Sequence, residues 1–444
     1  MKFNIYIILS LLILLSACGK EDRTNFSKDK DLYDLLASKS PKGTLEGLML
    51  AKGDRLSHIP QDPKNPLNSS KIQLGKLMFH ETGLAIDPQN SISMNTYSCA
   101  SCHHAEAGFQ SGKRQGIGDG GEGFGISGEG RHRNSNYPTN KIDVQPIKSP
   151  TVLNSAYQKL MLWNGQFGAT DKNIGTESNW APGSPIANNY LGYEGVETQA
   201  LAGFDVHRLG IKKDLLEDNT YKLLFENAFP DAPPQALITT QNIALAIAAY
   251  ERSLLSNAAP YQKWLRGDEN VMTTAQKNGM KLFFDKAQCY QCHNGPALNS
   301  NEFYALGMQD LEGSDIIEAA GADDAKLGRG GFTKLSQDMY KFKVPQLYNL
   351  RDAIFYGHGA SFDNIAKVIQ YKLEGKKENN SVPSTQLSHF FKKIDLTDTE
   401  IENLTDFITN SLYDASLSRY LPNSLPSGNC FPNNDSLSKK EICQ

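Results

Sequence analysis

Apolar side chains recur at helical spacing in several separate stretches of this 444-residue chain. The stretches that predict helices are 74–79, 242–255, 274–284, 365–373 and 397–412. Residues 108–140 are rich in Gly and polar side chains, which predicts a long loop. Alternating patterns typical of strands are scarce. The pattern therefore predicts a mostly α protein whose helices are connected by long loops.

The first residues carry an export signal. Lys2 supplies a positive charge, and an apolar run follows over residues 5–15. This run is too short to cross a bilayer comfortably and has the length of a signal-peptide core. It ends in Leu15-Ser-Ala-Cys18, which is similar to a bacterial lipobox. We therefore expect a signal peptide over 1–17 and a diacylglycerol anchor on Cys18, with an ordinary signal cleaved elsewhere as the alternative.

A polar tether and N-terminal extension follow over residues 18–58, with one amphipathic piece at 31–36. The lipid anchor predicts an exported lipoprotein on the periplasmic face of the cell envelope, at the outer membrane or exposed on the surface. The net charge of −4 favours neither nucleic acid nor an anionic membrane as a partner. We therefore expect membrane contact through the lipid alone and no nucleic-acid binding.

Four of the seven Cys lie in two C-x-x-C-H motifs, Cys99-Ala-Ser-Cys102-His103 and Cys289-Tyr-Gln-Cys292-His293. Two thiols at this spacing can form thioethers with the vinyl groups of haem, and the next His then ligates the iron. A zinc site built from both Cys pairs would leave the two His unexplained. A thioredoxin-like motif needs one pair and no following His. The motifs therefore predict two covalently bound haems c, with His103 and His293 on the irons.

Two further Cys, Cys430 and Cys443, lie in a tail rich in Pro, Asn and Ser. A disulfide between them would close the tail and suits an oxidising compartment. Free or intermolecular thiols are the alternative.

Each haem motif follows a predicted helix and precedes a loop, so the two halves form an internal duplication of one helix–CxxCH–loop–helix unit. We expect two c-type cytochrome-like domains, each wrapping one covalent haem with long loops. The first domain is predicted over 59–235 and the second over 236–425, with Asp231-Ala-Pro-Pro234 near the junction. Residues 426–444 form the tail.

The segments around both motifs resemble the bacterial dihaem cytochrome c peroxidase and MauG superfamily, over residues 60–422. The matching segments are Leu74–Phe79, Cys99–Phe109, Ser149–Asn154, Leu162–Gly165, Glu197–Ala200, Cys289–Pro296, Phe342–Pro345 and Tyr356–Gly359. Their order and spacing follow the family throughout. The resemblance implies an oxidoreductase with a peroxidatic first haem and an electron-transferring second haem.

The resemblance also gives roles to three further side chains. Trp163 falls where the family places a Trp between the haems, and Gln199 falls where a Gln lies over the first haem. Asn154 falls where the family binds a structural Ca²⁺ between the domains, together with backbone carbonyls near Ala353 and Phe355. Core packing for Trp163 and an ordinary helix position for Gln199 are the alternatives, and calcium binding stays open.

The chain departs from the family twice around the first haem. Many family peroxidases carry a His, in a Ser-Ile-Gly-His-Gly loop, that blocks this haem until the second is reduced, but this chain has Asp119 there. We therefore expect the first haem to be five-coordinate or water-bound as isolated. Arg208 stands in the register of the family's catalytic Glu, and its neighbour His207 has a suitable pKa for proton transfer. A structural role for either residue, such as on a haem propionate, is the alternative.

The sixth ligand of the second haem is a third departure. The family peroxidases use Met and MauG uses Tyr, at a fixed distance after the Tyr-x-His segment, but no Met follows Met339. Lys372 fits this register better, whereas Tyr371 supplies an anionic oxygen that suits ferric iron. On chemical grounds we favour Tyr371, although both can also be plain helix residues.

Taken together, the residues and the resemblance predict a dihaem c-type peroxidase. It would reduce hydrogen peroxide to water with electrons from a small periplasmic cytochrome c or a cupredoxin, using His207, Arg208, Gln199 and Trp163. A MauG-like oxidase of a protein or organic substrate is the alternative enzyme. A non-catalytic dihaem electron-transfer or sensing protein is the alternative from another class. Family members are often dimers, so a homodimer also stays open.

Overall fold

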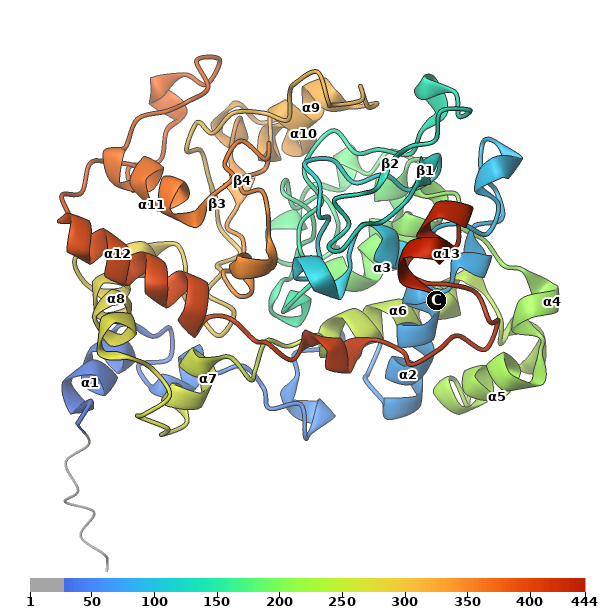
Figure 1. The fold of residues 1–444 in the computed structure, drawn as a ribbon, viewed down its shortest axis with the longest axis horizontal. Coiled ribbons are helices and arrows are strands. Elements are labelled where there is room, and N and C mark those ends of the chain that lie inside the picture. Colours follow the sequence, from blue (N-terminus) through green and yellow to red (C-terminus); the bar gives the residue numbers. More distant parts are fainter. Residues whose placement is uncertain (1–27, 444) are drawn as a thin grey trace, which may run out of the picture.

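The computed structural model describes residues 28–443 and is predominantly helical, as the pattern predicted (Figure 1). The export signal and Cys18 lie outside the described residues. The helices are α1 (Lys30–Lys39), α2 (Ser69–His80), α3 (Gly195–Val206), α4 (Lys213–Leu216), α5 (Asn219–Ala228), α6 (Thr240–Ser253), α7 (Pro260–Leu265), α8 (Thr274–Phe284), α9 (Ala322–Lys326), α10 (Arg329–Thr333), α11 (Ile365–Glu374), α12 (Asp398–Asp406) and α13 (Ser436–Ile442). Short antiparallel ribbons pair β1 (Gly121–Glu122) with β2 (His132–Arg133) and β3 (Phe303–Tyr304) with β4 (Phe342–Lys343).

Local capping signals decide where the predicted helices begin. The Asn68 side chain accepts a hydrogen bond from the Lys71 amide at 2.7 Å and starts α2. Thr273 starts α8 and Thr397 starts α12, each through a capping box. These caps satisfy amide groups that have no partner inside the helix. The predicted helix at 274–284 is therefore found with the same bounds, and the one at 397–412 is found as α12 followed by a π-helical turn.

The hydrophobic pattern did not predict α3 and α5, two helices of the first half. In α3 the polar residues Glu197 and Thr198 are fully buried together with the apolar ones. Glu197 is tolerated there because it accepts two hydrogen bonds from the buried Arg252, at 2.7 and 2.6 Å. A helix with polar groups on its buried face lacks the contrast that periodicity detects.

Two hydrophobic cores divide the molecule, one to each side of Figure 1. The first core contains α2, α3, α5 and α6, and the second contains α1, α7, α8, α11 and α12. Sequence analysis assigned α6 to the second domain, but its apolar residues pack in the first core against α2 and α3. α6 therefore packs with the first half, whereas the domain boundary near residue 235 stays a prediction. Periodicity identifies an apolar face but does not say which core receives it.

Each core contains a pair of helices that cross at a glycine. A Cβ added to Gly75 of α2 would lie 1.8 Å from the Ala246 carbonyl oxygen of α6. A Cβ added to Gly279 of α8 would lie 1.9 Å from the Asn403 carbonyl oxygen of α12. Any larger side chain would force each pair apart. Because α2 and α8 both lead into a C-x-x-C-H motif, this repeated crossing supports the internal duplication.

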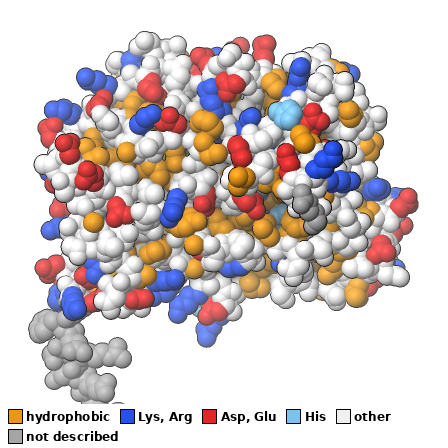
Figure 2. All heavy atoms as spheres, in the orientation of Figure 1, with side chains coloured by type: hydrophobic (Ala, Val, Ile, Leu, Met, Phe, Trp, Pro, Cys, Tyr) orange, Lys and Arg blue, Asp and Glu red, His pale blue; other side chains and the backbone are white. Residues whose placement is uncertain are grey.

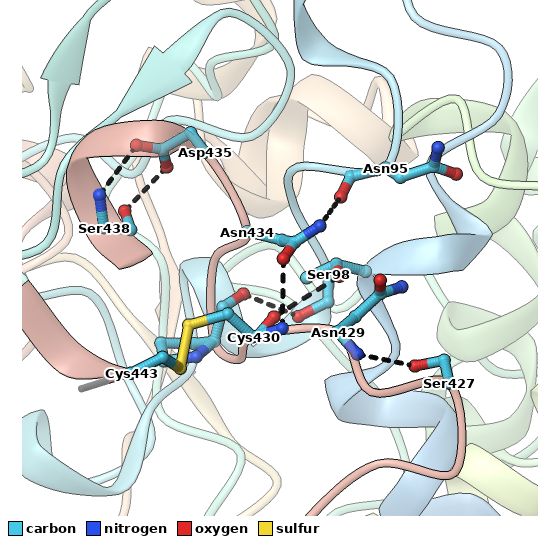
Figure 3. Close-up of a disulfide and its surroundings, with 11 residues drawn as sticks. Asn95, Ser98, Ser427, Asn429, Cys430, Asn434, Asp435, Ser438 and Cys443 are labelled. Carbon is cyan, nitrogen blue, oxygen red and sulfur yellow. Dashed lines mark hydrogen bonds between the residues drawn. A yellow bond between two sulfur atoms is a disulfide. The ribbon is translucent and has the colours of Figure 1, made fainter. Parts of the chain in front are cut away.

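After α12 the chain returns to the first half of the molecule (Figure 1). There Cys430 and Cys443 are joined by a disulfide, the pairing that the sequence favoured (Figure 3). The hydroxyls of Ser98 and Ser101 both donate to the Pro432 carbonyl at 3.1 Å. The tail therefore packs directly on the segment that carries the first haem motif.

The surface carries both signs of charge. On the face shown in Figure 2, acidic and basic side chains are interspersed, in keeping with the small net charge. Within residues 28–443, no helix has both the length and the apolar character that a membrane crossing requires.

Candidate functional site

The two C-x-x-C-H motifs adopt the same tight turn. Cys99–Ser101 and Cys289–Gln291 form 3-10 turns, and the amide of the following His donates to the first Cys carbonyl, at 3.2 Å for His103 and 2.9 Å for His293. In the first motif, both thiols and the imidazole line one cavity. The four thiols of the two motifs are free. Burial raises the pKa of Cys99, Cys102 and Cys289 to about 12.

Both motif histidines are held as an iron ligand requires. The Nδ1 atom of His103 lies 3.4 Å from the Phe109 carbonyl, and that of His293 lies 3.0 Å from the Leu298 carbonyl. Such a bond fixes the ring and leaves Nε2 for the metal. Burial lowers the pKa of both rings to about 4, so they are neutral, the form that ligates iron. The residues present therefore fit a covalently attached haem at each motif.

Each motif opens into a cavity of about 1490 Å³, counted with its open mouth. Cys99, Cys102 and His103 line the first haem cavity. Cys292 and His293 line the second haem cavity.

His207 is one of the polar side chains that line the first haem cavity. It lies directly after α3, and its Nδ1 atom lies 2.7 Å from Oδ2 of the buried Asp143. Burial lowers the pKa of His207, but the charge and hydrogen bond of Asp143 outweigh this effect and leave the pKa raised. Asp143 also lines the cavity. Sequence analysis missed it, because it lies in a loop without periodicity.

Arg208 is not brought to this cavity. Its backbone has a φ of +55°. Its guanidinium donates to Asp119 Oδ2 at 2.5 Å and to the Lys141 carbonyl at 2.7 Å. Neither Arg208 nor Asp119 is among the residues that line the first haem cavity. The two residues that depart from the family here therefore form one ion pair beside the cavity.

Two polar side chains in the first haem cavity have an oxygen without a hydrogen-bond partner in the part of the chain that the structure describes. These oxygens are Oε1 of Gln199 and Oε2 of Glu251. Burial, with a contribution from Glu197, raises the pKa of Glu251 to about 8, so this carboxyl is protonated at neutral pH. Gln199 therefore lines the first haem cavity, and its place over the haem stays a prediction. Glu251 was not expected, although an acid one turn after Ile247 on an apolar helix is a signal that could have revealed it.

A wall shared by both cavities separates the two motifs. It contains Lys148, Pro150, Met161 and Leu162, which line both cavities. Trp163 follows directly and lines the second haem cavity, where its indole Nε1 donates to the Lys148 carbonyl at 2.8 Å. The structure therefore places Trp163 next to the wall between the two cavities.

Lys372, and not Tyr371, lines the second haem cavity. The Tyr371 hydroxyl donates to the Leu306 carbonyl at 2.6 Å, and its ring packs between Phe362 and Phe391. Successive residues of an α-helix point about 100° apart, so neighbours on α11 cannot both face the haem motif. This placement runs against the chemical preference for Tyr371. Burial lowers the pKa of Lys372 to about 8.

Asn154 is buried between the two halves, but its side chain bonds to protein groups. Its Oδ1 accepts from the Ser256 amide at 3.0 Å, and its Nδ2 donates to Gln346 Oε1 at 3.2 Å. The Ala353 carbonyl accepts from the Tyr356 hydroxyl at 2.8 Å. Among residues 28–443, no group of three or more His, Cys, Asp or Glu could hold a metal ion. Calcium binding stays a prediction.

Comparisons with known proteins agree with this arrangement. A family model described as di-haem cytochrome c peroxidase matches residues 69–270. The chain is 30% identical over 308 residues to cytochrome c peroxidase Ccp of Escherichia coli. The aligned region covers 69% of this chain but only 53% of that protein. It is 26% identical over 366 residues to methylamine utilization protein MauG of Methylorubrum extorquens, covering 81% of this chain and 82% of MauG.

The fold agrees as well. The crystal structure of a MauG-like protein associated with microbial copper homeostasis matches with a TM-score of 0.59, over 83% of this chain and 95% of that chain, at 24% identity. The two haem motifs, the shared wall and the matched sequence region lead to the same conclusion. Over residues 69–270 the chain matches the family of di-haem cytochrome c peroxidases, and its relatives include cytochrome c peroxidases and MauG.

Proposed function

We propose that this protein is a peroxidase that reduces hydrogen peroxide to water with electrons from a small exported electron carrier. The observation that supports this best is the His207–Asp143 pair in the first haem cavity. When bound, the first haem supplies an iron that binds peroxide and accepts electrons. One peroxide takes up two electrons and two protons and gives two waters. Groups of this chain must therefore deliver protons at the cavity.

His207 is the group suited to move these protons. Its Nδ1 is occupied by Asp143, which leaves Nε2 available to take a proton from one peroxide oxygen and return it to the other. The Asp143 carboxylate stabilises the imidazolium that forms in between. The Gln199 side chain, with its free Oε1, can orient the peroxide. In this proposal His207 does the work of the family's Glu, and Asp143 replaces Arg208 as its partner.

Arg208 and Asp119 have a different role in this proposal. Their ion pair holds the loop over 116–120, where many relatives have the blocking His, with Asp119 buried outside the cavity. A carboxylate that is already bonded to an arginine is a poor ligand for haem iron. The first haem is therefore proposed to be open as isolated, without the need for prior reduction of the second.

Lys372 is proposed as the sixth ligand of the second haem. It lines the cavity that contains His293, and it is the residue that fits the family register. A neutral amine can ligate iron, and burial favours the neutral form of this lysine. Trp163, beside the shared wall, is proposed to lie on the path of electrons between the haems.

The electron donor is proposed to be a small cytochrome c or a cupredoxin. The two haem motifs and the disulfide suit an oxidising compartment, and we propose the periplasmic face of the envelope with an anchor at Cys18. A homodimer is the proposed assembly, on the basis of the family alone.

A rapid-mixing experiment tests the proposed reaction. The reduced protein is mixed with hydrogen peroxide, and reoxidation of the haems is followed by absorbance in wild type and in His207→Ala. We expect turnover to fall by roughly 10²–10⁴-fold in the variant, the usual contribution of a positioned acid–base group. Slow oxidation that is the same in both proteins would instead indicate an electron-transfer protein.

A MauG-like oxidase is the second candidate, because the similarity to MauG covers 82% of that protein. The same experiment distinguishes it. An oxidised spectrum that persists after peroxide is added without any donor would favour this candidate, whereas rapid return to the resting spectrum with a reduced cytochrome favours the peroxidase.

A further inference from the structure

Two buried lysines on the wall of the second haem cavity have no counter-ion among residues 28–443. Lys148 is 2% exposed and Lys343 is 6% exposed, and both line this cavity. The Lys148 ammonium donates to Gln110 Oε1 at 2.6 Å. The Lys343 ammonium donates to the Leu160 carbonyl at 2.7 Å and to the Gln158 amide oxygen. All of these partners are neutral.

An ammonium buried in this way is costly unless an anion compensates it. Burial alone lowers the pKa of Lys148 and of Lys343 to about 7. Among the described residues, no carboxylate forms an ion pair with either group. The one carboxylate that lines this cavity is Asp310, and it is bonded to His358 and Asn379. The cavity therefore has an excess of positive charge that the protein itself does not balance.

We propose that Lys148 and Lys343 form a subsite that binds the two propionate carboxylates of the second haem. The number of ammonium groups equals the number of propionates on one haem. Charge-assisted bonds of this type are among the stronger hydrogen bonds in proteins. The inference rests on the second haem of the proposed function, but not on the reaction with peroxide.

The placement of the lysines suits this role. Both are bonded to Trp163, since the Trp163 indole donates to the Lys148 carbonyl and the Lys343 amide donates to the Trp163 carbonyl at 2.7 Å. The thioether positions and the propionates lie at different edges of a haem c. Groups that hold the propionates must therefore come from segments other than the C-x-x-C-H turn, and Lys148 and Lys343 lie in two such segments that line the cavity.

Lys148 has a further consequence, because it lines both cavities. A positive charge beside a haem favours its reduced form, so the subsite raises the midpoint potential of the second haem. The backbone carbonyl of Lys148 accepts a hydrogen bond from the Trp163 indole, so the residue lies beside Trp163 at the shared wall. The subsite that would hold the second haem therefore includes a residue of the wall between the two cavities.

The test replaces each lysine and measures the second haem without peroxide. Lys148→Met and Lys343→Met are compared with Lys326→Met by spectroelectrochemical titration. Lys326 is a matched control because it lines the same cavity but pairs with Glu312 at 3.0 Å. We expect each of the first two variants to shift the reduction equilibrium about tenfold towards the ferric haem, which is about 59 mV for one electron. Lys326→Met should leave it unchanged.

A second readout reports on the propionates themselves. Resonance Raman bands of propionate bending should shift in Lys148→Met and Lys343→Met and stay in place in the control. If a Met variant fails to retain haem, Lys148→Gln or Lys343→Gln, which removes the charge and keeps an amide, is measured in the same way. Unchanged potentials and unchanged propionate bands in the haem-loaded variants would overturn the inference. A shifted potential in a protein that shows no peroxide turnover would overturn the proposed function and leave the subsite intact.

Discussion

The two haem cavities share one attachment motif but differ in the charged groups around it. Both use the same Cys turn and a His whose Nδ1 is bonded to a backbone carbonyl. The first cavity adds groups that carry protons, the His207–Asp143 pair and Glu251. The second adds Lys343 and Lys372, and it shares Lys148 with the first. Covalent attachment is thus encoded locally, whereas the chemistry of each haem depends on residues from distant segments.

This contrast assigns different tasks to the two halves. Proton-carrying groups are useful where peroxide is split, because the reaction consumes protons. Lysines are useful where a haem is to be held firmly and kept closed to peroxide, since they can bind its propionates and occupy its iron. Substitutions that act on one cavity and leave the other unaffected test this difference.

The largest effect is expected from Lys372→Ala. If Lys372 ligates the second haem, its loss should convert that haem completely from a low-spin to a high-spin or water-bound ferric form, while the first haem is unchanged. Absorbance and electron paramagnetic resonance of the oxidised protein measure this. Tyr371→Phe is the matched control, because it removes only the hydroxyl bonded to Leu306. A change in the Phe variant with none in the Ala variant would restore Tyr371 as the ligand.

The disulfide is expected to stabilise the first half alone. Its loop spans 13 positions, and the tail contacts Ser98 and Ser101 beside the first motif. In the Cys430→Ser/Cys443→Ser variant, the free energy of unfolding should fall by about 3 kcal/mol, the contribution of closing a loop of this length. Thermal unfolding followed by haem absorbance tests this. Equal destabilisation of both haem environments would show that the tail supports the whole molecule.

The sequence predicted what depends on short-range signals. The haem motifs and the start of α8 each lie within a few neighbouring positions, and the two Cys of the tail disulfide lie 13 positions apart, so composition and spacing were enough. Asp143 was missed because it meets His207 across 64 positions, from a loop with no pattern. The choice between Tyr371 and Lys372 depends on which face of α11 points towards the cavity. Ligand chemistry alone does not reveal that face.

The buried charges illustrate the same limit. Lys148 and Lys343 look like ordinary surface residues in the sequence, and only the fold shows that both are buried beside one cavity. Likewise, α6 has a clear apolar face in the sequence, but only the fold shows that this face packs against α2 and α3. Long-range placement was therefore the part that sequence patterns could not supply.

A smaller effect is expected from Asp143→Asn. The charge of Asp143 raises the pKa of His207, and His207 must be neutral to accept a proton, so wild-type activity falls as pH drops below this raised pKa. Removing the charge lowers the pKa, and the acidic limb of kcat/KM should move to lower pH. The maximal rate should fall about tenfold, equivalent to about 1.4 kcal/mol. An acidic limb that stays in place would mean that His207 is not the proton carrier.

The smallest effect on turnover is expected from Arg208→Ala, directly beside His207 in the chain. Its guanidinium bonds to Asp119 and lies outside the first haem cavity, so peroxide turnover should change by less than about 3-fold. Stability should respond more, because Asp119 is fully buried and loses a partner, at a cost of about 1–3 kcal/mol. Denaturant unfolding and steady-state kinetics on the same preparation separate the two effects. Arg208→Lys, which keeps the charge, should recover part of the stability. A large loss of turnover in a stably folded Ala variant would instead place Arg208 in the reaction and return it to the role that its register with the family's Glu first suggested.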